Sequence, residues 1–198
     1  MKTLINSVLK SGSVAIVLLA SVFSLTASAA TVTIDKGAAG REIKKVIVTG
    51  NTKVLLVQNS QEYVTMEDLD MKKVSVKQIG STLTISSTES SPVTVTVYVK
   101  DLYRIDASEQ ANVRTVGKFN LTNLQVMLKD DASARVKANT GSIYTVINDR
   151  ANLELIGKTD KHIYEIAGIA KMDTDKFAAT KSQYTKVYEK AVVFNAKK

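Results

Sequence analysis

One short phrase returns three times in this chain, as EQANV at residues 109–113, DDASA at 130–134 and DRANL at 149–153. An alanine holds the third place in each phrase, and two more alanines continue the spacing. The set is Ala111, Ala132, Ala151, Ala170 and Ala191, separated by 21, 19, 19 and 21 residues. A period near ~20 residues that carries short strand-like segments is typical of stacked repeats.

Apolar residues lie on both sides of each alanine, so one unit holds two short strands joined at the alanine. Ile105 and Val113 flank Ala111 in this way. A single unit cannot bury its apolar face, but stacked units pair equivalent strands in a parallel sheet and bury a continuous column. Stacked corners leave little room for side chains, which suits alanine. The repeat therefore predicts an all-β solenoid, a parallel β-helix with ~20-residue coils.

Residues before the repeat alternate apolar and polar side chains with period two, which indicates further strands. The expected strands are 45–49, 53–58, 73–76, 82–86 and 93–99. We therefore expect one β-solenoid domain over residues 30–198. Within it, residues 30–100 form an N-terminal strand region that leads into the repeat coils of residues 101–198.

The first 29 residues resemble a secretory signal peptide. Lys2 and Lys10 supply a basic start, residues 13–25 are apolar, and Ala27-Ser28-Ala29 fits the cleavage rule, with cutting one residue later also allowed. The apolar run is shorter than the ~20 residues of a membrane-spanning helix. No cysteine follows it, which excludes a lipoprotein. The sequence predicts export to the periplasm, cell surface or medium, with no transmembrane segment after cleavage.

Composition excludes several function classes. The chain has no cysteine, so neither disulfides nor thiol catalysis contribute. Its net charge is +8, and removal of the two leader lysines leaves +6. The lysines are spread along the chain and the five arginines are scattered without aromatic neighbours. This pattern favours a solvated surface over a nucleic-acid partner.

Acidic residues stand just before the alanines. Glu109, Asp130 and Asp149 precede their alanine by two positions, and Asp131 precedes Ala132 by one. Stacked coils would place these carboxylates about 4.8 Å apart. They could form a weak calcium-binding edge or a solvated ladder of turns. We favour the ladder because Gly168 interrupts the column.

Catalytic motifs are absent from the sequence. His162 is the one histidine, and a histidine between lysine and isoleucine is expected at the surface or at a strand edge. No zinc-ligand spacing, phosphate-binding loop or serine elbow is present. Asp130, Asp131 and Asp149 are the best acid pair candidates for polysaccharide chemistry. We predict no catalytic residue, no metal site and no cofactor.

Three tyrosines follow the opening apolar residue of a unit, namely Tyr103, Tyr144 and Tyr164. They could form a ladder on one face of the coils. An outward ladder could stack glycans or dock a protein, and an inward ladder would be core packing. Tyr103 has the strand parity of Ile105, and Tyr144 and Tyr164 each match the apolar residue two positions on, which favours the inward orientation.

Residues 41–195 resemble the GIN-domain family, described as the head domain of autotransporter-type adhesins. The matching phrases are KVLLVQ at 53–58, KVSV at 73–76, GSTLTIS at 80–86, VTVYV at 95–99 and LYRI at 102–105. The resemblance implies a right-handed, pectin-lyase-like β-solenoid without the catalytic residues of the lyases. Such repeats centre on Gly-Ser-Gly turns, which are EQA, DDA and DRA here, so we expect altered corner geometry.

These features lead to an exported, non-enzymatic β-solenoid for cell-surface adhesion or envelope protein–protein contact. The alternative is a secreted carbohydrate-binding or polysaccharide-cleaving protein that uses Glu109, Asp130, Asp131 and Asp149. A third possibility is a periplasmic scaffold. The partner would be a cell-surface glycan or an envelope protein. Exposed strand edges at the solenoid ends predict end-to-end association, unless residues 41–48 or the lysine-rich C-terminus cap them.

Overall fold

The computed structural model describes residues 29–32, 42–67 and 70–185. Apart from one 3₁₀ residue at Asp70, the regular structure in these residues consists of strands, so the predicted all-β class is confirmed. No helix there is long and apolar enough to cross a membrane. The predicted signal peptide lies outside the described residues except for Ala29, which begins the first strand.

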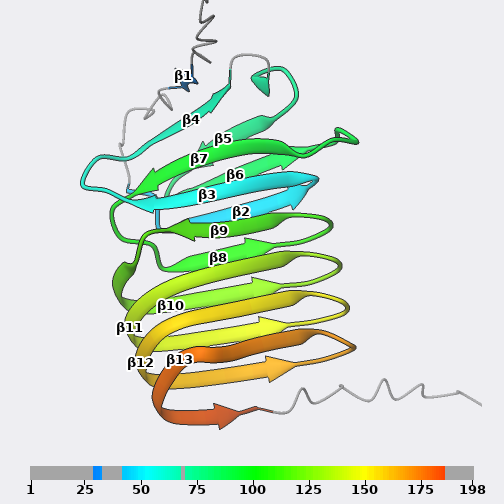
Figure 1. Cartoon of the computed structure of the whole chain (residues 1–198). Helices are drawn as coiled ribbons and strands as arrows, with labels where there is room; N and C mark the ends of the chain where they lie inside the picture. The colour runs from blue at the N-terminus through cyan, green and yellow to red at the C-terminus, as the bar shows by residue number, and fades with distance from the viewer. Residues whose placement is uncertain (1–28, 33–41, 68–69, 186–198) are drawn as a thin grey trace, which may run out of the picture.

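Thirteen strands form one curled, mixed sheet (Figure 1). They are β1 (Ala29–Val32), β2 (Lys45–Gly50), β3 (Thr52–Gln58), β4 (Tyr63–Glu67), β5 (Ser75–Ile79), β6 (Thr82–Ser87), β7 (Val93–Val99), β8 (Arg104–Ala107), β9 (Asn112–Val116), β10 (Phe119–Leu128), β11 (Ser133–Ile147), β12 (Asn152–Ile166) and β13 (Lys171–Tyr184). Four of the five strands expected before the repeat are present with ends within one residue, whereas the strand expected at 73–76 shares only residues 75 and 76 with β5.

Strands far apart in the chain stack in parallel (Figure 1). β2 lies between β6 and β8, and β3 lies between β7 and β9. Strands β2 and β3 therefore lie in the interior of the stack. The chain then builds the β6 and β7 layer on one side before it returns to build every later layer on the other.

The long strands β10 to β13 bend around the molecule and pair in parallel along nearly their whole length. Asn120 stands opposite Asn139, and Asn139 stands opposite Lys158. Residues nineteen apart in the sequence are thus neighbours across β10, β11 and β12, the same spacing that separates Ala132 from Ala151.

Antiparallel strands close the other end, so the uniformly parallel sheet expected from the repeat does not extend to the N-terminal region. β4 pairs antiparallel with β7, β1 with β4, and β5 with β6. The expectation that residues 41–48 cap an end is wrong, because β2 carries buried Val46 and Val48 and has a partner on both edges.

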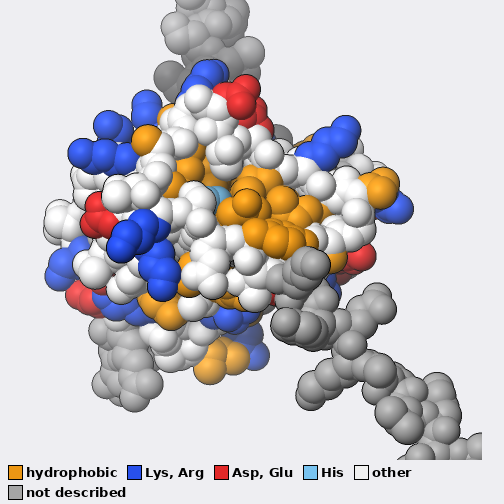
Figure 2. Space-filling model, turned by 90° about the horizontal axis from the view of Figure 1, so that it is seen from below, with side chains coloured by type: hydrophobic (Ala, Val, Ile, Leu, Met, Phe, Trp, Pro, Cys, Tyr) orange, Lys and Arg blue, Asp and Glu red, His pale blue; other side chains and the backbone are white. Residues whose placement is uncertain are grey.

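Among the described strands, β13 pairs only with β12, which leaves one of its edges without a strand. Seen from this end, hydrophobic side chains gather in one patch (Figure 2). The lysine-rich C-terminus and Ala191 lie outside the described residues. End-to-end association therefore stays a prediction.

Inward-facing residues stack into apolar columns. Val48, Ala107, Leu128 and Ile147 form one column across four strands, and all are buried. Each fully buried large aliphatic side chain contributes roughly 1.5–3 kcal/mol. Repetition of the column from layer to layer is therefore what holds the long coils together.

The corner alanines form a second buried column. Ala111, Ala132 and Ala151 are all fully buried. The N–H of Ser133 donates to the Ala111 carbonyl at 2.9 Å, and the N–H of Asn152 donates to the Ala132 carbonyl at 3.0 Å. Each alanine thus sits directly beside its equivalent in the next layer, where a larger side chain would collide with the neighbouring turn.

Candidate functional site

The turns after β8, β10 and β11 share one shape. In each, the alanine N–H donates to the carbonyl three residues earlier, at 3.2 Å for Ala111, 3.2 Å for Ala132 and 3.1 Å for Ala151. The turns also bond to one another, as the Arg150 N–H does to the Asp130 carbonyl at 2.9 Å. We call these three turns, with the acidic residues they carry, the turn stack.

The first central residue of each turn has a left-handed backbone, with φ of 59° at Glu109, 60° at Asp130 and 60° at Asp149. Glycine fills this place in the flanking turns, where φ is 71° at Gly50 and 70° at Gly168. The predicted change of corner geometry is wrong, because the three acidic residues adopt the conformation of glycine. That conformation costs an L-residue roughly 1–2 kcal/mol.

The aspartate side chains bond to the neighbouring turn. Asp130 Oδ2 accepts from the N–H of Glu109 at 3.0 Å, and Asp149 Oδ2 accepts from the N–H of Asp130 at 3.0 Å. Each carboxylate therefore satisfies a backbone donor that has no other role in the turn. The structure brings Glu109, Asp130 and Asp149 into one column, as predicted from their spacing.

Asp131 and Arg150 form a second contact between turns. Arg150 Nε and a terminal guanidinium nitrogen donate to the two Asp131 carboxylate oxygens, both at 2.6 Å. The hydrogen bond from Arg150 holds the pKa of Asp131 below its ordinary value, and the same bond raises the pKa of Arg150. This bidentate geometry fixes both side chains on the exposed surface.

Within the described ranges, no group of three or more His, Cys, Asp or Glu side chains is placed to hold a metal ion. The turn stack instead points one oxygen of Asp130 and one of Asp149 at backbone N–H groups. A calcium ion needs several oxygens directed at one point. The geometry of the turns therefore corresponds to a solvated ladder of turns and not to a calcium-binding edge.

The three tyrosines do not form one ladder. Tyr103 precedes β8 and its side chain is 47% exposed, so the inward orientation predicted for it is wrong. Strand alternation does not apply at Tyr103, because β8 begins only at the next residue. Tyr144 lies between the buried residues Ile143 and Thr145 and faces outward. The predicted inward orientation is wrong there too.

Tyr164 faces inward, as predicted. It stands opposite the buried Thr145, and its ring centroid lies 5.0 Å from that of His162 and 5.5 Å from that of Tyr184. Tyr144 and Tyr164 face opposite sides of the sheet because Ile143 pairs with His162. A shared tyrosine ladder would require Ile143 to stand opposite Ile163, one residue away.

The two outward tyrosines bond to polar neighbours. The Tyr103 hydroxyl accepts from Gln125 Nε2 at 2.8 Å. The Tyr144 hydroxyl donates to Glu165 Oε1 on the neighbouring strand, and this bond raises the pKa of Tyr144 to about 12. Both hydroxyls therefore have a partner within the sheet.

His162 is buried, which corrects the prediction of a surface or strand-edge position. Its side chain is 3% exposed, and its Nε2 lies 3.0 Å from Thr145 Oγ1. The Phe177 ring meets it edge-on at a centroid distance of 5.5 Å. Burial lowers the pKa of His162. The ring thus packs against the core, with the Thr145 hydroxyl as its hydrogen-bond partner and no carboxylate among its described contacts.

A groove crosses the bend of β10 to β13, at the far end of each coil from the turns. Its volume is about 750 Å³. We call it the bend groove, and its lining is Asn120, Leu121, Thr122, Asn139, Thr140, Lys158, Thr159, Asp160, Ala178, Ala179 and Thr180. Asn139 Nδ2 donates to Asn120 Oδ1 at 3.3 Å, and the hydroxyls of Thr140 and Thr159 bond at 2.9 Å.

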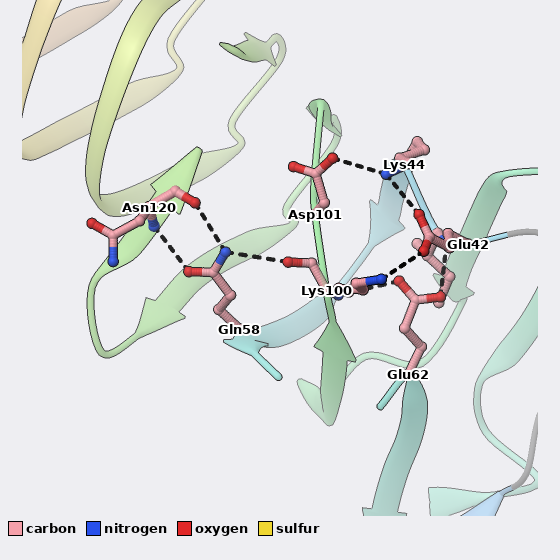
Figure 3. A network of polar contacts seen from close by, with 8 residues as sticks. Glu42, Lys44, Gln58, Glu62, Lys100, Asp101 and Asn120 are labelled. Atoms are coloured by element: carbon pink, nitrogen blue, oxygen red, sulfur yellow. Dashed lines mark hydrogen bonds and ion pairs between the residues drawn. The ribbon is translucent and has the colours of Figure 1, made fainter. Parts of the chain in front are cut away.

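Gln58 fixes Asn120, a residue of the groove lining, through hydrogen bonds (Figure 3). Its Oε1 accepts from the N–H of Asn120 at 2.9 Å. Its Nε2 donates to the carbonyls of Asn120 at 3.0 Å and of Lys100 at 3.2 Å. One amide thus joins the end of β3, the start of β10 and the segment after β7, three segments far apart in the chain.

A second part of this network fixes the segment before β2 (Figure 3). Glu62 accepts from the N–H of Ile43 at 3.0 Å and from the N–H of Lys100 at 3.1 Å. Glu42 pairs with Lys44 at 2.9 Å and with Lys100 at 3.1 Å, and these bonds lower its pKa, with Lys44 the larger cause. The network therefore joins the segment before β2, the segment before β4 and the segment after β7.

Sequence reasoning did not identify the bend groove. Asn120, Asn139 and Lys158 are spaced by nineteen residues, the spacing of the later alanines. Extension of the repeat from the corner to the bend would have placed these side chains in one column. Gln58 gives no such signal, because its partners are Lys100 and Asn120, far away in the sequence.

The family model that matches the chain is described as "putative auto-transporter adhesin, head GIN domain" and covers residues 42–187. A search of curated proteins finds no match.

Solved structures show the same fold at low identity. A putative adhesin from Bacteroides fragilis has a TM-score of 0.66 at 12% identity, over 80% of this chain and 75% of the other. A putative lipid binding protein from Parabacteroides distasonis has a TM-score of 0.59 at 11% identity, over 80% and 78%. A putative adhesin from Parabacteroides merdae has 0.54 at 14% identity, over 80% and 77%.

Proposed function

The chain belongs to the GIN-domain family, and from this premise we propose that it is an exported, non-enzymatic adhesin-like module. The observation that carries the proposal is the use of the turn carboxylates. Asp130 and Asp149 each hold the backbone N–H of a neighbouring turn, and Asp131 holds Arg150. The acidic residues act as structural links between layers, and the side walls of the stack are left for binding.

The competing function is polysaccharide cleavage by the turn carboxylates. Glycosidases need one carboxylic acid that donates a proton and a second carboxylate that acts as base or nucleophile on the same bond. Both aspartates of the column would have to release a backbone N–H to take these roles. Each aspartate directs one carboxylate oxygen at a backbone N–H of the neighbouring turn, and this use of the side chains favours a structural role over catalysis.

We also propose that the stacked layers form a right-handed, pectin-lyase-like parallel β-helix with ~20-residue coils. Parallel strands joined by a crossover are right-handed in about 98% of cases. The parallel pairing of β10 to β13 supports such coils. On this proposal residues 1–29 are removed on export, and residues 30–198 form one domain with strands over 30–100 and coils over 101–198.

The site of action on this proposal is the cell surface, and the partner is a surface glycan. The test uses intact cells of the producing species and the purified mature chain. Protease added to intact cells should digest the protein, and beads coated with the chain should be retained on cells. A pool that is protected until the outer envelope is opened, together with no bead retention, would contradict the proposal and favour the periplasmic scaffold.

A further inference from the structure

We propose that the bend groove binds a single strand of an uncharged polysaccharide that runs along the stack axis. This inference rests on the proposed adhesin-like function and names the class of its ligand. It assigns binding to the bend of the coils and leaves the turn stack as scaffold. No acidic turn residue lines the groove.

The groove presents hydrogen-bonding groups of both kinds. Asn120 and Asn139 carry amides that both donate and accept, Lys158 donates, and Asp160 accepts. Thr122 and Thr180 add hydroxyls on exposed residues. A sugar hydroxyl also donates and accepts, so each position along a saccharide can meet a partner of either kind. No aromatic ring lines the groove, and binding therefore rests on these hydrogen bonds.

Small residues keep the groove open. Gly141 lies on β11 in the same bend but not in the lining, and it lets β10 and β11 approach closely, because a Cβ added there would lie 3.0 Å from the Thr122 carbonyl oxygen. Ala178 and Ala179 present only methyl groups at the β13 end. Methyl groups suit the apolar C–H faces of a sugar ring. The buried hydroxyls of Thr140 and Thr159 bond to each other beneath them.

The spacing of the polar groups favours a polymer over a free monosaccharide. Equivalent side chains recur on β10, β11 and β12, as Asn120, Asn139 and Lys158 do. Neighbouring strands are about 4.8 Å apart, so four strands extend over about 14 Å. A chain of several linked sugars can therefore meet one set of polar groups after another.

The charges of the lining select against charged polymers. Lys158 and Asp160 are the charged residues in the lining, and they carry opposite signs. A polyanion would meet the Asp160 carboxylate and a polycation would meet the Lys158 ammonium. The groove is also built on paired strands with Asn120 fixed by Gln58, so binding orders little of the protein.

Isothermal titration of the mature chain with cellohexaose, xylohexaose and mannohexaose tests the proposal. The groove variant is Asn139→Ala with Lys158→Ala. The matched control is Asn152→Ala with Lys171→Ala. Asn152, like Asn139, lies on a strand and donates one side-chain hydrogen bond, and Lys171, like Lys158, is exposed. Circular dichroism and thermal melts establish that both variants are folded.

We expect at least one hexasaccharide to bind, with affinity reduced tenfold or more in the groove variant and unchanged in the control. No binding by any of the three probes, or equal binding by both variants, would overturn the groove assignment. Bead retention on cells separates this failure from failure of the adhesin proposal. Retention that survives in the groove variant leaves the adhesin-like function standing, whereas absence of retention in every form removes it.

Discussion

Asp149 Oδ2 accepts a hydrogen bond from the backbone N–H of Asp130, in the next turn of the stack, at 3.0 Å. Both residues have φ of 60°, a backbone conformation that usually selects glycine. The hydrogen bond therefore links two layers and offsets part of the strain within them. It explains how this chain keeps glycine-like corners while it carries acidic residues there.

The first prediction concerns Asp149. Its change to Ala removes the acceptor and keeps the strained backbone, and we expect a loss of about 1–2 kcal/mol in the free energy of unfolding. Its change to Gly removes the same acceptor but relieves the strain, so the loss should be smaller. Urea unfolding of both variants measures the difference. Equal losses would show that the backbone at Asp149 is not strained.

Glu109 gives the converse case. It has the same backbone conformation, and no hydrogen bond or ion pair of its carboxylate occurs in the described part of the chain. Relief of about 1–2 kcal/mol of strain should exceed the roughly 0.4–1 kcal/mol that glycine costs through the unfolded chain. Glu109→Gly should therefore stabilise the protein slightly in urea unfolding. A clear loss of stability would assign the side chain a role that the structure does not give it.

His162 should make stability depend on pH. Burial lowers its pKa in the folded state, so the unfolded chain binds the proton more tightly. Stability is then full above the ordinary pKa of about 6.5 and falls as the pH drops through it. The groups packed on the ring are Thr145, Tyr164 and Phe177, and none carries a positive or negative charge near neutral pH.

Thermal melts from about pH 7.5 to about pH 5 test this dependence. The wild type should lose more stability over this range than His162→Gln, which cannot gain a proton. Because the carboxylates are the same in both proteins, the difference between the two curves isolates the contribution of His162. Parallel curves for the two proteins would contradict the buried, neutral histidine.

Tyr144 offers a spectroscopic test of the sheet register. Its hydrogen bond to Glu165 raises its pKa from the ordinary 10.0 to about 12, so its hydroxyl should stay protonated at a pH between these values. Glu165→Gln should lower this pKa toward the ordinary value of 10.0. NMR of the ring carbons across alkaline pH measures it. Glu154 lies on β12 like Glu165 but pairs with Arg135 of β11, so Glu154→Gln should leave the pKa of Tyr144 unaffected.

The all-β class and the parallel layers could be predicted because their signals are local and periodic. Alternation of apolar residues marked the strands, and the alanine spacing marked the corners. The register between β11 and β12 could not be predicted to the residue. Ile163 is apolar like Ile143, yet the polar His162 takes the inward place opposite Ile143. A buried histidine stabilised by ring packing does not follow the apolar pattern.

The antiparallel end and the Gln58 network were beyond the reach of sequence patterns. More buried and more exposed residues alternate in β4 and β5 as in the other strands. This alternation is the same in parallel and antiparallel strands, so it does not show strand direction. Gln58 bonds only to partners far along the chain, Asn120 and Lys100, which no local motif encodes. The acidic turn residues were placed in the correct column, but their left-handed backbone was not foreseen because it depends on hydrogen bonds from the neighbouring turn.

The most direct test of a non-catalytic turn stack is a reducing-end assay with the mature chain and a panel of plant and bacterial polysaccharides. We predict no product above the buffer blank, and no difference between the wild type and Asp130→Asn or Asp149→Asn. Asparagine keeps an acceptor for the neighbouring N–H and tolerates the left-handed backbone, so these variants should stay folded. Product that the wild type releases and either variant fails to release would contradict the account.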